Sequence, residues 1–293
     1  MLNGRTIFKD RSNAIYQILK HYPPGLMVDA GAAAGHMTGL MLRASPTSRV
    51  HAFEPFPGNF KFFNEHIGDD PRVTLDKRAV SDAPGKANFL VPSSVAGTEA
   101  GWENMKGYSS LGMLGAPKEG QVSITVERCR IDDVVNEQVR FLKIDTQGAE
   151  SKVLRGCSKL FDKDMIDIMF VEFDGKNDVI QIILDHGFTI IGTECVLVVE
   201  THEKPDKWDV IREGVLSTGL KSLKAWPKQH ISDPYDYSQF LRDERKLLGK
   251  TWTDLVCVSK SALPWFMYAA GKRDQEVGPQ QAFSVKGPLS DIL

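Results

Sequence analysis

The chain has 293 residues, of which 42% are apolar and 25% charged, as in an ordinary soluble globular protein. Its net charge of −2, with mixed signs throughout, argues against non-specific binding to nucleic acid or to an anionic membrane. The sequence contains no secretory signal and no apolar run that could span a bilayer, so we expect a cytoplasmic protein with reduced cysteines.

Strands alternate with helices through the first eighty residues. The apolar spacing predicts, in chain order, a helix over 12–20, a strand over 26–28, a helix ending near 43, a strand over 49–53, a helix over 60–67 and a strand over 73–80. This alternation is typical of a parallel sheet with helices on both faces.

The next part of the chain begins with two strands, over 86–91 and 122–126, that flank a long segment rich in Gly and Ser. A segment of that length inside a compact domain is usually functional or disordered. The alternation then resumes with a strand over 139–144, a helix over 150–160, a strand over 166–173, a helix over 178–186, and strands over 188–192, 195–200 and 255–259.

These elements divide the chain into three parts. We expect an N-terminal helix in residues 1–25, one domain over 26–262, and a loosely ordered polar tail over 263–293. The domain would contain a functional loop over 92–120 and an aromatic- and proline-rich cap or insertion over about 201–250.

The segment VDAGAAAGHMTG, residues 28–39, joins a buried strand to a helix. Asp29 ends the strand, Gly31 permits a close backbone approach, and Gly35 precedes the helix. A dinucleotide site would carry G-x-G-x-x-G, whose second and third glycines are here Ala33 and His36. The loop therefore suits a nucleoside without phosphates, such as S-adenosylmethionine, about as well as it suits a turn selected only for packing.

Two further carboxylates end predicted strands. Glu54, in HAFEP, could accept hydrogen bonds from both hydroxyls of a ribose, although an NAD enzyme places an acid similarly. Asp145 closes the buried strand of FLKIDTQGAESKVLRG, whereas Gly148 and Glu150 are explained by the turn and the helix dipole. Open parallel sheets bind ligands at the carboxyl ends of their strands, so these acids indicate a nucleoside site.

Six segments in this order resemble the FkbM family of S-adenosylmethionine-dependent methyltransferases: VDAGAAAGHMTG, VHAFEPFPGNF, KRAVSDAPGKANF, VERCRIDDV, FLKIDTQGAESKVLRG and FVEF. The resemblance covers about residues 26–188. It implies an α/β class I methyltransferase (Rossmann-like) fold, with a mostly parallel seven-stranded sheet, helices on both faces, an extra β-hairpin and a C-terminal cap. It also implies O-methylation of a hydroxyl on a sugar, glycan or small secondary metabolite. The alanines at 32–34 stand where relatives usually carry an Asn, and His36 stands where an aromatic residue is common.

The resemblance also implies S-adenosylmethionine as the cofactor and identifies the residues that would contact it. The methionine part would lie against Asp29, Gly31, Ala32 and Gly35, the ribose against Glu54 and Pro55, the adenine against Ala79, Val80 and Ser81, and the sulfonium near Asp145.

Methylation of an alcohol requires that its proton leave, so a general base contributes. Asp145 is the first candidate base, and Glu172 and His36 are the second and third. Each has a simpler alternative role: Asp145 could only orient the cofactor, Glu172 could cap or pair within the domain, and His36 could pack against the first helix. Magnesium held by Asp145, Glu172 and Asp174 is a further alternative, but without a stronger ligand cluster we expect no metal.

The expected partner is a small-molecule or glycan acceptor rather than nucleic acid or a membrane, and a homo-oligomer is left open. Two other functions compete with O-methylation. An NAD-linked oxidoreductase or epimerase is compatible with Glu54, but alanine and histidine at 33 and 36 argue against it. A non-catalytic nucleoside-binding relative would not need the intact set of Asp29, Gly31, Glu54 and Asp145.

Overall fold

The structure is a computed structural model that describes residues 4–7, 11–92, 113–114, 121–173, 177–193, 196–199 and 253–266. The chain divides into two compact units, Pro24–Ile166 and a second unit made of Met1–Pro23 with Asp167–Leu293. The insertion expected over 201–250 and most of the loop over 92–120 and of the tail lie outside the described residues. The single domain expected over 26–262 stays a prediction.

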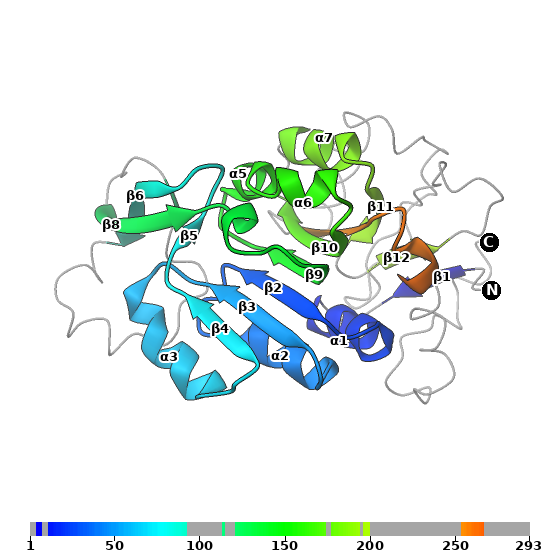
Figure 1. Cartoon of the computed structure of the whole chain (residues 1–293), viewed down its shortest axis with the longest axis horizontal. Helices are drawn as coiled ribbons and strands as arrows, with labels where there is room; N and C mark the ends of the chain where they lie inside the picture. The colour runs from blue at the N-terminus through cyan, green and yellow to red at the C-terminus, as the bar shows by residue number, and fades with distance from the viewer. Residues whose placement is uncertain are drawn as a thin grey trace, which may run out of the picture. The chain divides into compact units, whose positions relative to one another are not determined.

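Four parallel strands form the central sheet of the unit over 24–166. Their order is β9 (Val139–Ile144), β2 (Leu26–Ala30), β3 (Arg49–Phe53) and β4 (Val73–Asp76). The crossover helices α2 (His36–Ala44) and α3 (Pro57–Ile67) lie on one side of this sheet, and α5 (Glu150–Arg155) and α6 (Ser158–Asp162) lie on the other (Figure 1). This parallel arrangement confirms the expected Rossmann-like α/β fold.

The core of this unit lies along β2 and β9. Strands covered on both faces read as nearly continuous apolar runs, and eight apolar side chains of these two strands are buried: Leu26, Met27, Val28, Ala30, Val139, Phe141, Leu142 and Ile144. Two charged residues, Asp29 and Lys143, are buried in the same strands. Both lie near the carboxyl ends of the strands.

A second sheet in the same unit contains the predicted hairpin. Strand β6 (Gly85–Pro92) pairs antiparallel with β8 (Gln121–Cys129) and with the short β7 (Met113–Leu114), while β5 (Ala79–Val80) runs parallel to β8. Phe56, just after β3, is buried against this sheet in a cluster with Ala79, Phe89, Val91 and Val126. This packing connects the chain after β3 to the second sheet.

The strand predicted over 73–80 is wrong as a single element. It ends at Asp76, whose carboxylate accepts hydrogen bonds from the backbone N–H and the guanidinium of Arg78. An aspartate that bonds the backbone two residues onward forms a turn. The chain therefore changes direction, and Ala79 and Val80 pair with β8 instead of continuing along β3.

The helix predicted over 150–160 is likewise two helices, α5 and α6, that separate at Gly156. The carbonyl of Gly156 accepts the backbone N–H of Asp132, which follows β8. The carboxylate of Asp132 in turn accepts the N–H groups of Lys159 and Leu160 in the first turn of α6. Residues distant in sequence thus supply the cap that starts the second helix.

The described residues of the other unit include an antiparallel sheet and the helices α1 (Arg11–His21) and α7 (Asn177–Asp185). Its strand order is β1 (Gly4–Ile7), β12 (Val196–Val199), β11 (Thr189–Thr193), β13 (Thr253–Val258) and β10 (Ile166–Phe173). The apolar spacing does not predict β1. None of the described helices is both long and apolar enough to cross a bilayer.

Gly31 allows β2 and β9 to approach each other at their carboxyl ends. Its φ is +85°, and a Cβ atom at this position would lie 2.0 Å from the backbone oxygen of Asp145. The backbone N–H of Asp145 donates to the carbonyl of Ala30 at 3.0 Å, and this hydrogen bond holds the ends of the two strands close together. Only glycine fits both the dihedral angle and the space.

We therefore expect Gly31→Ala to be far more destabilising than Gly187→Ala. Gly187 has a similar φ of +75°, but apart from its own atoms and those of its two chain neighbours, none is found within 4 Å of the position that its Cβ would occupy. The left-handed conformation alone should cost Gly187→Ala about 1–2 kcal/mol, and steric overlap should raise the loss for Gly31→Ala to roughly 2–5 kcal/mol. Urea unfolding of both variants measures the difference, and equal losses would contradict the close approach.

Candidate functional site

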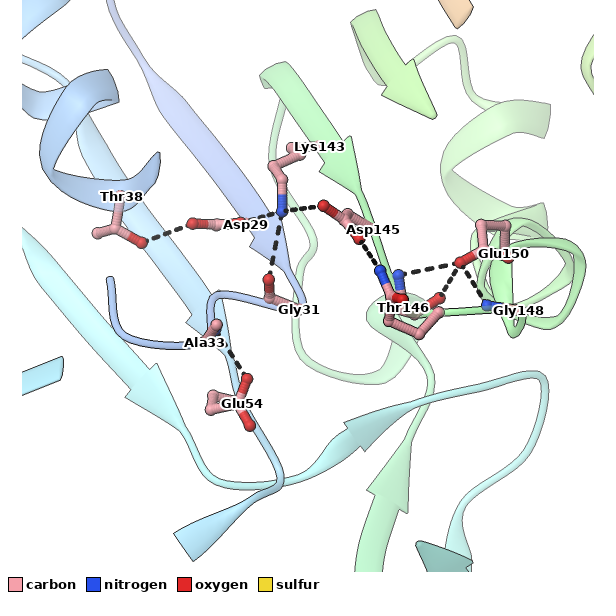
Figure 2. Close-up of polar contacts among 11 residues, drawn as sticks. Asp29, Gly31, Ala33, Thr38, Glu54, Lys143, Asp145, Thr146, Gly148 and Glu150 are labelled. Carbon is pink, nitrogen blue, oxygen red and sulfur yellow. Dashed lines mark hydrogen bonds and ion pairs between the residues drawn. The ribbon is translucent and has the colours of Figure 1, made fainter. Parts of the chain in front are cut away.

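Three carboxylates lie at the carboxyl edge of the parallel sheet, as the sequence predicts. Strand β2 pairs with both β3 and β9, with Ala30 opposite Phe53 and Ile144. Asp29 of β2, Glu54 just after β3 and Asp145 just after β9 therefore lie at the same edge (Figure 2). This is the edge at which open parallel sheets bind ligands.

The loop after β2 alternates left-handed residues. Gly31, Ala33 and Gly35 have φ values of +85°, +48° and +83°. Position 33, where the sequence lacks the glycine of a dinucleotide fingerprint, thus adopts the conformation that glycine favours. An alanine there is strained by about 1–2 kcal/mol. The backbone N–H groups of Gly31 and Ala32 both donate to the carbonyl of Phe53, which fastens the loop to the end of β3.

Glu54 is buried and held by backbone groups on both sides. Its Oε2 accepts the N–H of Ala33 at 2.8 Å, and its Oε1 accepts the N–H of Phe56 at 2.8 Å. A third hydrogen bond comes from the side chain of Asn59. Burial raises the pKa of Glu54 above its ordinary value, although the three hydrogen bonds act in the opposite direction.

Asp29 has a fully buried side chain and two partners. Its Oδ2 accepts the hydroxyl of Thr38 in α2 at 2.7 Å, and its Oδ1 lies 3.3 Å from Nζ of Lys143. The first contact ties α2 to β2, and the second ties β2 to β9. The sequence assigns Asp29 to the cofactor's methionine part; the geometry gives it an anchoring role at this edge.

Lys143 is a buried residue of this edge that the sequence patterns did not single out. Its Nζ lies 3.3 Å from Asp29, 3.2 Å from the carbonyl of Gly31 and 3.5 Å from Oδ2 of Asp145, and its side chain is only 4% exposed (Figure 2). A signal was present, because a lysine inside the apolar strand VRFLKI is rarely buried without carboxylate partners.

The segment after β9 positions Asp145. Gln147, at a left-handed φ of +55°, donates from Nε2 to Oδ1 of Asp145 at 2.8 Å. Glu150 is buried, and its Oε1 accepts the N–H groups of Thr146 and Gly148 and the hydroxyl of Thr146. Glu150 therefore shapes the turn as well as opening α5, whereas the sequence indicated only the helix role. The side chain of Asp145 is 14% exposed.

Ala79, Val80 and Ser81, expected beside the adenine, form buried backbone at the end of β5. The N–H of Ser81 donates to the carbonyl of Cys129 at 2.9 Å. A Cβ on Gly156 would lie 2.2 Å from the carbonyl oxygen of Ser81, so the break between α5 and α6 packs directly on this segment.

His36 and Glu172 have other surroundings. His36, the exposed first residue of α2, packs edge-on against His66 of α3 with ring centroids 4.1 Å apart. Partial burial and the neighbouring His66 lower the pKa of His36. Glu172 is buried in β10 of the other unit, opposite Asp254 of β13.

The magnesium alternative involves Asp174, which lies outside the described residues. Within the described part of the chain, no group of three His, Cys, Asp or Glu side chains is arranged to hold a metal ion.

Two further residues expected at the cofactor are Pro55 and Gly35. Pro55 lies between Glu54 and the buried Phe56, and Gly35 packs against Phe63 and Ile67 of α3.

We expect Ala33→Gly to stabilise the protein by about 0.5–1 kcal/mol, because relief of the left-handed strain outweighs the added entropy of the unfolded chain. Ala34→Gly is the matched control. Its φ is not positive, and its buried methyl group would be lost, so it should destabilise the protein by about 1 kcal/mol. Thermal unfolding of the two variants should give shifts of opposite sign, and a destabilised Ala33→Gly would refute the strain.

The chain is similar in sequence to known methyltransferases. The methyltransferase FkbM domain matches residues 29–190, more than half of the chain. "Methyltransferase 1" of Beauveria bassiana (strain ARSEF 2860) is 29% identical over 189 residues, which are 59% of this chain and 74% of that protein. "2-O-methyltransferase NoeI" of Sinorhizobium fredii (strain NBRC 101917 / NGR234) is 28% identical over 156 residues, which are 48% of this chain and 60% of that protein.

Among solved structures, the methyltransferase FkbM of Methylobacillus flagellatus KT overlaps 51% of this chain and 32% of its own, at 15% identity and a TM-score of 0.34. The domain match contains the β2–α2 loop, Glu54, and the segment from Lys143 to Glu150. With its Rossmann-like sheet and this match, the chain belongs to the FkbM methyltransferase family.

Proposed function

We propose that this methyltransferase uses S-adenosylmethionine to methylate a hydroxyl oxygen of a sugar, a glycan or a small secondary metabolite. Family membership supports methyl transfer. The choice of oxygen is supported by one relative, the 2-O-methyltransferase NoeI, of whose length this chain spans 60%. The choice of cofactor is supported by the carboxyl edge of the parallel sheet.

The position of Glu54 is the observation that carries the cofactor proposal. A carboxylate has about four lone-pair sites, and the N–H groups of Ala33 and Phe56 and the side chain of Asn59 occupy three of those of Glu54. The side chain is thereby fixed in place before a ligand arrives and retains capacity to accept from one hydroxyl of a ribose. Charge-assisted hydrogen bonds of this kind are strong and directional.

The other residues of the edge fit the rest of the cofactor. The small residues from Gly31 to Gly35 leave room for the methionine part beside the loop. The resemblance assigns the adenine to the segment of Ala79, Val80 and Ser81, whose side chains are buried. Asp145 supplies a partly exposed carboxylate that suits a sulfonium cation.

When bound, S-adenosylmethionine supplies an activated methyl group. The chain must then bind the acceptor, align its oxygen and remove its proton. Alignment of reacting groups is worth roughly 7–11 kcal/mol where the geometry is favourable. The rigid hydrogen bonds of Glu54, Asp29 and Asp145 serve this alignment.

The two competing functions are affected differently. A methyltransferase family leaves no support for the NAD-linked oxidoreductase or epimerase. A non-catalytic relative that only binds the nucleoside differs from an enzyme in lacking methyl-transfer activity.

We expect transfer of a labelled methyl group from S-adenosylmethionine to a member of a panel of glycans and hydroxylated metabolites. Binding of the cofactor without transfer to any acceptor would favour the non-catalytic relative.

Glu54→Ala should weaken S-adenosylmethionine binding about 10- to 100-fold, because it removes a charge-assisted hydrogen bond worth roughly 1.5–3 kcal/mol. Isothermal titration calorimetry measures the affinity. Glu54→Gln retains the shape of the side chain, so its affinity for S-adenosylmethionine should lie between those of the wild type and of Glu54→Ala. The control is Glu127→Ala, which removes an exposed acid on β8. An unchanged affinity in Glu54→Ala would remove this residue from the site.

Asp145→Asn distinguishes a base from a cofactor ligand. Loss of a general base would lower kcat by about 10²–10⁴ even at saturating cofactor. Loss of a ligand would raise the KM for S-adenosylmethionine and largely preserve kcat. Because Lys143 and Gln147 both contact the Asp145 carboxylate, we expect the second pattern. Steady-state kinetics with an acceptor identified in the panel measures both constants, and a large fall in kcat alone would identify Asp145 as the base.

A further inference from the structure

Lys143 is a buried cation that the proposed roles of the carboxylates leave unused. Its ammonium group has three donor hydrogens, and three oxygens lie within 3.5 Å: one each from Asp29, Gly31 and Asp145. The three acceptors come from two strands and one loop. A single side chain thus holds together the parts of the edge that would face a ligand.

The charged side chains of this cluster differ in their exposure to solvent. The cluster contains two carboxylates, Asp29 and Asp145, and one ammonium. Asp29 is fully buried between Lys143 and the hydroxyl of Thr38, so its charge is compensated within the protein. Asp145 is 14% exposed, and its longer distance of 3.5 Å to the ammonium leaves it the outer member of the cluster. Asp145 is therefore the carboxylate of this cluster that a ligand can reach from solvent.

We propose that Lys143 is a positioning residue that holds Asp145 as an anionic ligand for the sulfonium group of the bound cofactor. The proposal rests on the proposed function and adds a role for Lys143 in that same site. Lys143 fixes Oδ2 and Gln147 fixes Oδ1, so the carboxylate cannot rotate freely.

This role has a consequence for the two forms of the cofactor. S-adenosylmethionine carries a sulfonium cation, whereas its product, S-adenosylhomocysteine, carries a neutral thioether in the same place. An anionic ligand aimed at the sulfur favours the first form over the second. A lysine that only holds the fold together would affect both forms equally.

The experiment measures the affinities of both compounds by isothermal titration calorimetry, in the wild type and in two variants of Lys143. Lys143→Met removes the charge from a side chain of similar length. We expect it to weaken S-adenosylmethionine binding about tenfold and S-adenosylhomocysteine binding less than about threefold. Lys143→Arg keeps the charge and should restore part of the preference. Lys152→Met, which removes an exposed lysine of α5, is the matched control and should change neither affinity.

Lys143→Met could also unfold the protein, because it leaves Asp29 buried without its cation. The double variant Lys143→Met/Asp29→Asn removes one charge of each sign and keeps the net charge of the cluster. Thermal unfolding should show it to be more stable than Lys143→Met alone. Its preference for S-adenosylmethionine should nevertheless stay reduced, because Asp145 has lost the group that positions it.

The outcomes separate the two proposals. Equal weakening of both compounds, or tighter binding of S-adenosylmethionine in Lys143→Met, would overturn the positioning role and leave the proposed function intact. A wild-type protein that binds neither compound would overturn the proposed function, and the role of Lys143 would fall with it.

Discussion

The carboxyl edge of the parallel sheet depends on the ion pairs that the buried ammonium of Lys143 forms with Asp29 and Asp145. Without this ammonium, Asp29 and Asp145 would bring two negative charges to the ends of adjacent strands in a place with little water, where burial of an unpaired charge is costly. The same ammonium contacts the carbonyl of Gly31, which lies against the backbone of Asp145. Charge pairing and steric fit therefore select the same strand geometry.

Backbone groups fix the remaining part of the site. Ala33 accepts a strained dihedral angle and thereby directs its N–H to Glu54, and Phe56 gives the same carboxylate its second amide. Phe56 is itself buried against the second sheet. The position of one acid is therefore determined jointly by the β2–α2 loop, by β3 and by the hairpin, and it does not depend on a flexible side chain finding a partner. Such preorganisation lowers the cost of binding a ligand.

This arrangement suits a reaction in which the transferred group arrives already activated. The chain then contributes most through alignment, and carboxylates that are immobilised by donors are better suited to orienting a cation than to collecting a proton. Asp145 illustrates the difference: its place at the end of a strand suggests a base, whereas contacts from Lys143 and Gln147 favour a fixed anion. The identity of a residue and its place on a strand are thus insufficient to assign its role.

The sequence by itself determined the alternation of strands and helices over residues 24–166, the family, and the edge at which Asp29, Glu54 and Asp145 gather. These features follow from local apolar spacing and from the rule that parallel strands end at a common edge. Only the tertiary structure decided where the strand over 73–80 turns, where the helix over 150–160 breaks, and what Lys143 contacts. The turn after Asp76 depends on a local contact with Arg78 that leaves the apolar spacing unchanged. The other two features depend on remote partners, because Asp132 caps α6 from another segment and Lys143 reaches from β9 to β2. Spacing along the chain carries no information about such contacts, because they form only when distant strands are brought side by side.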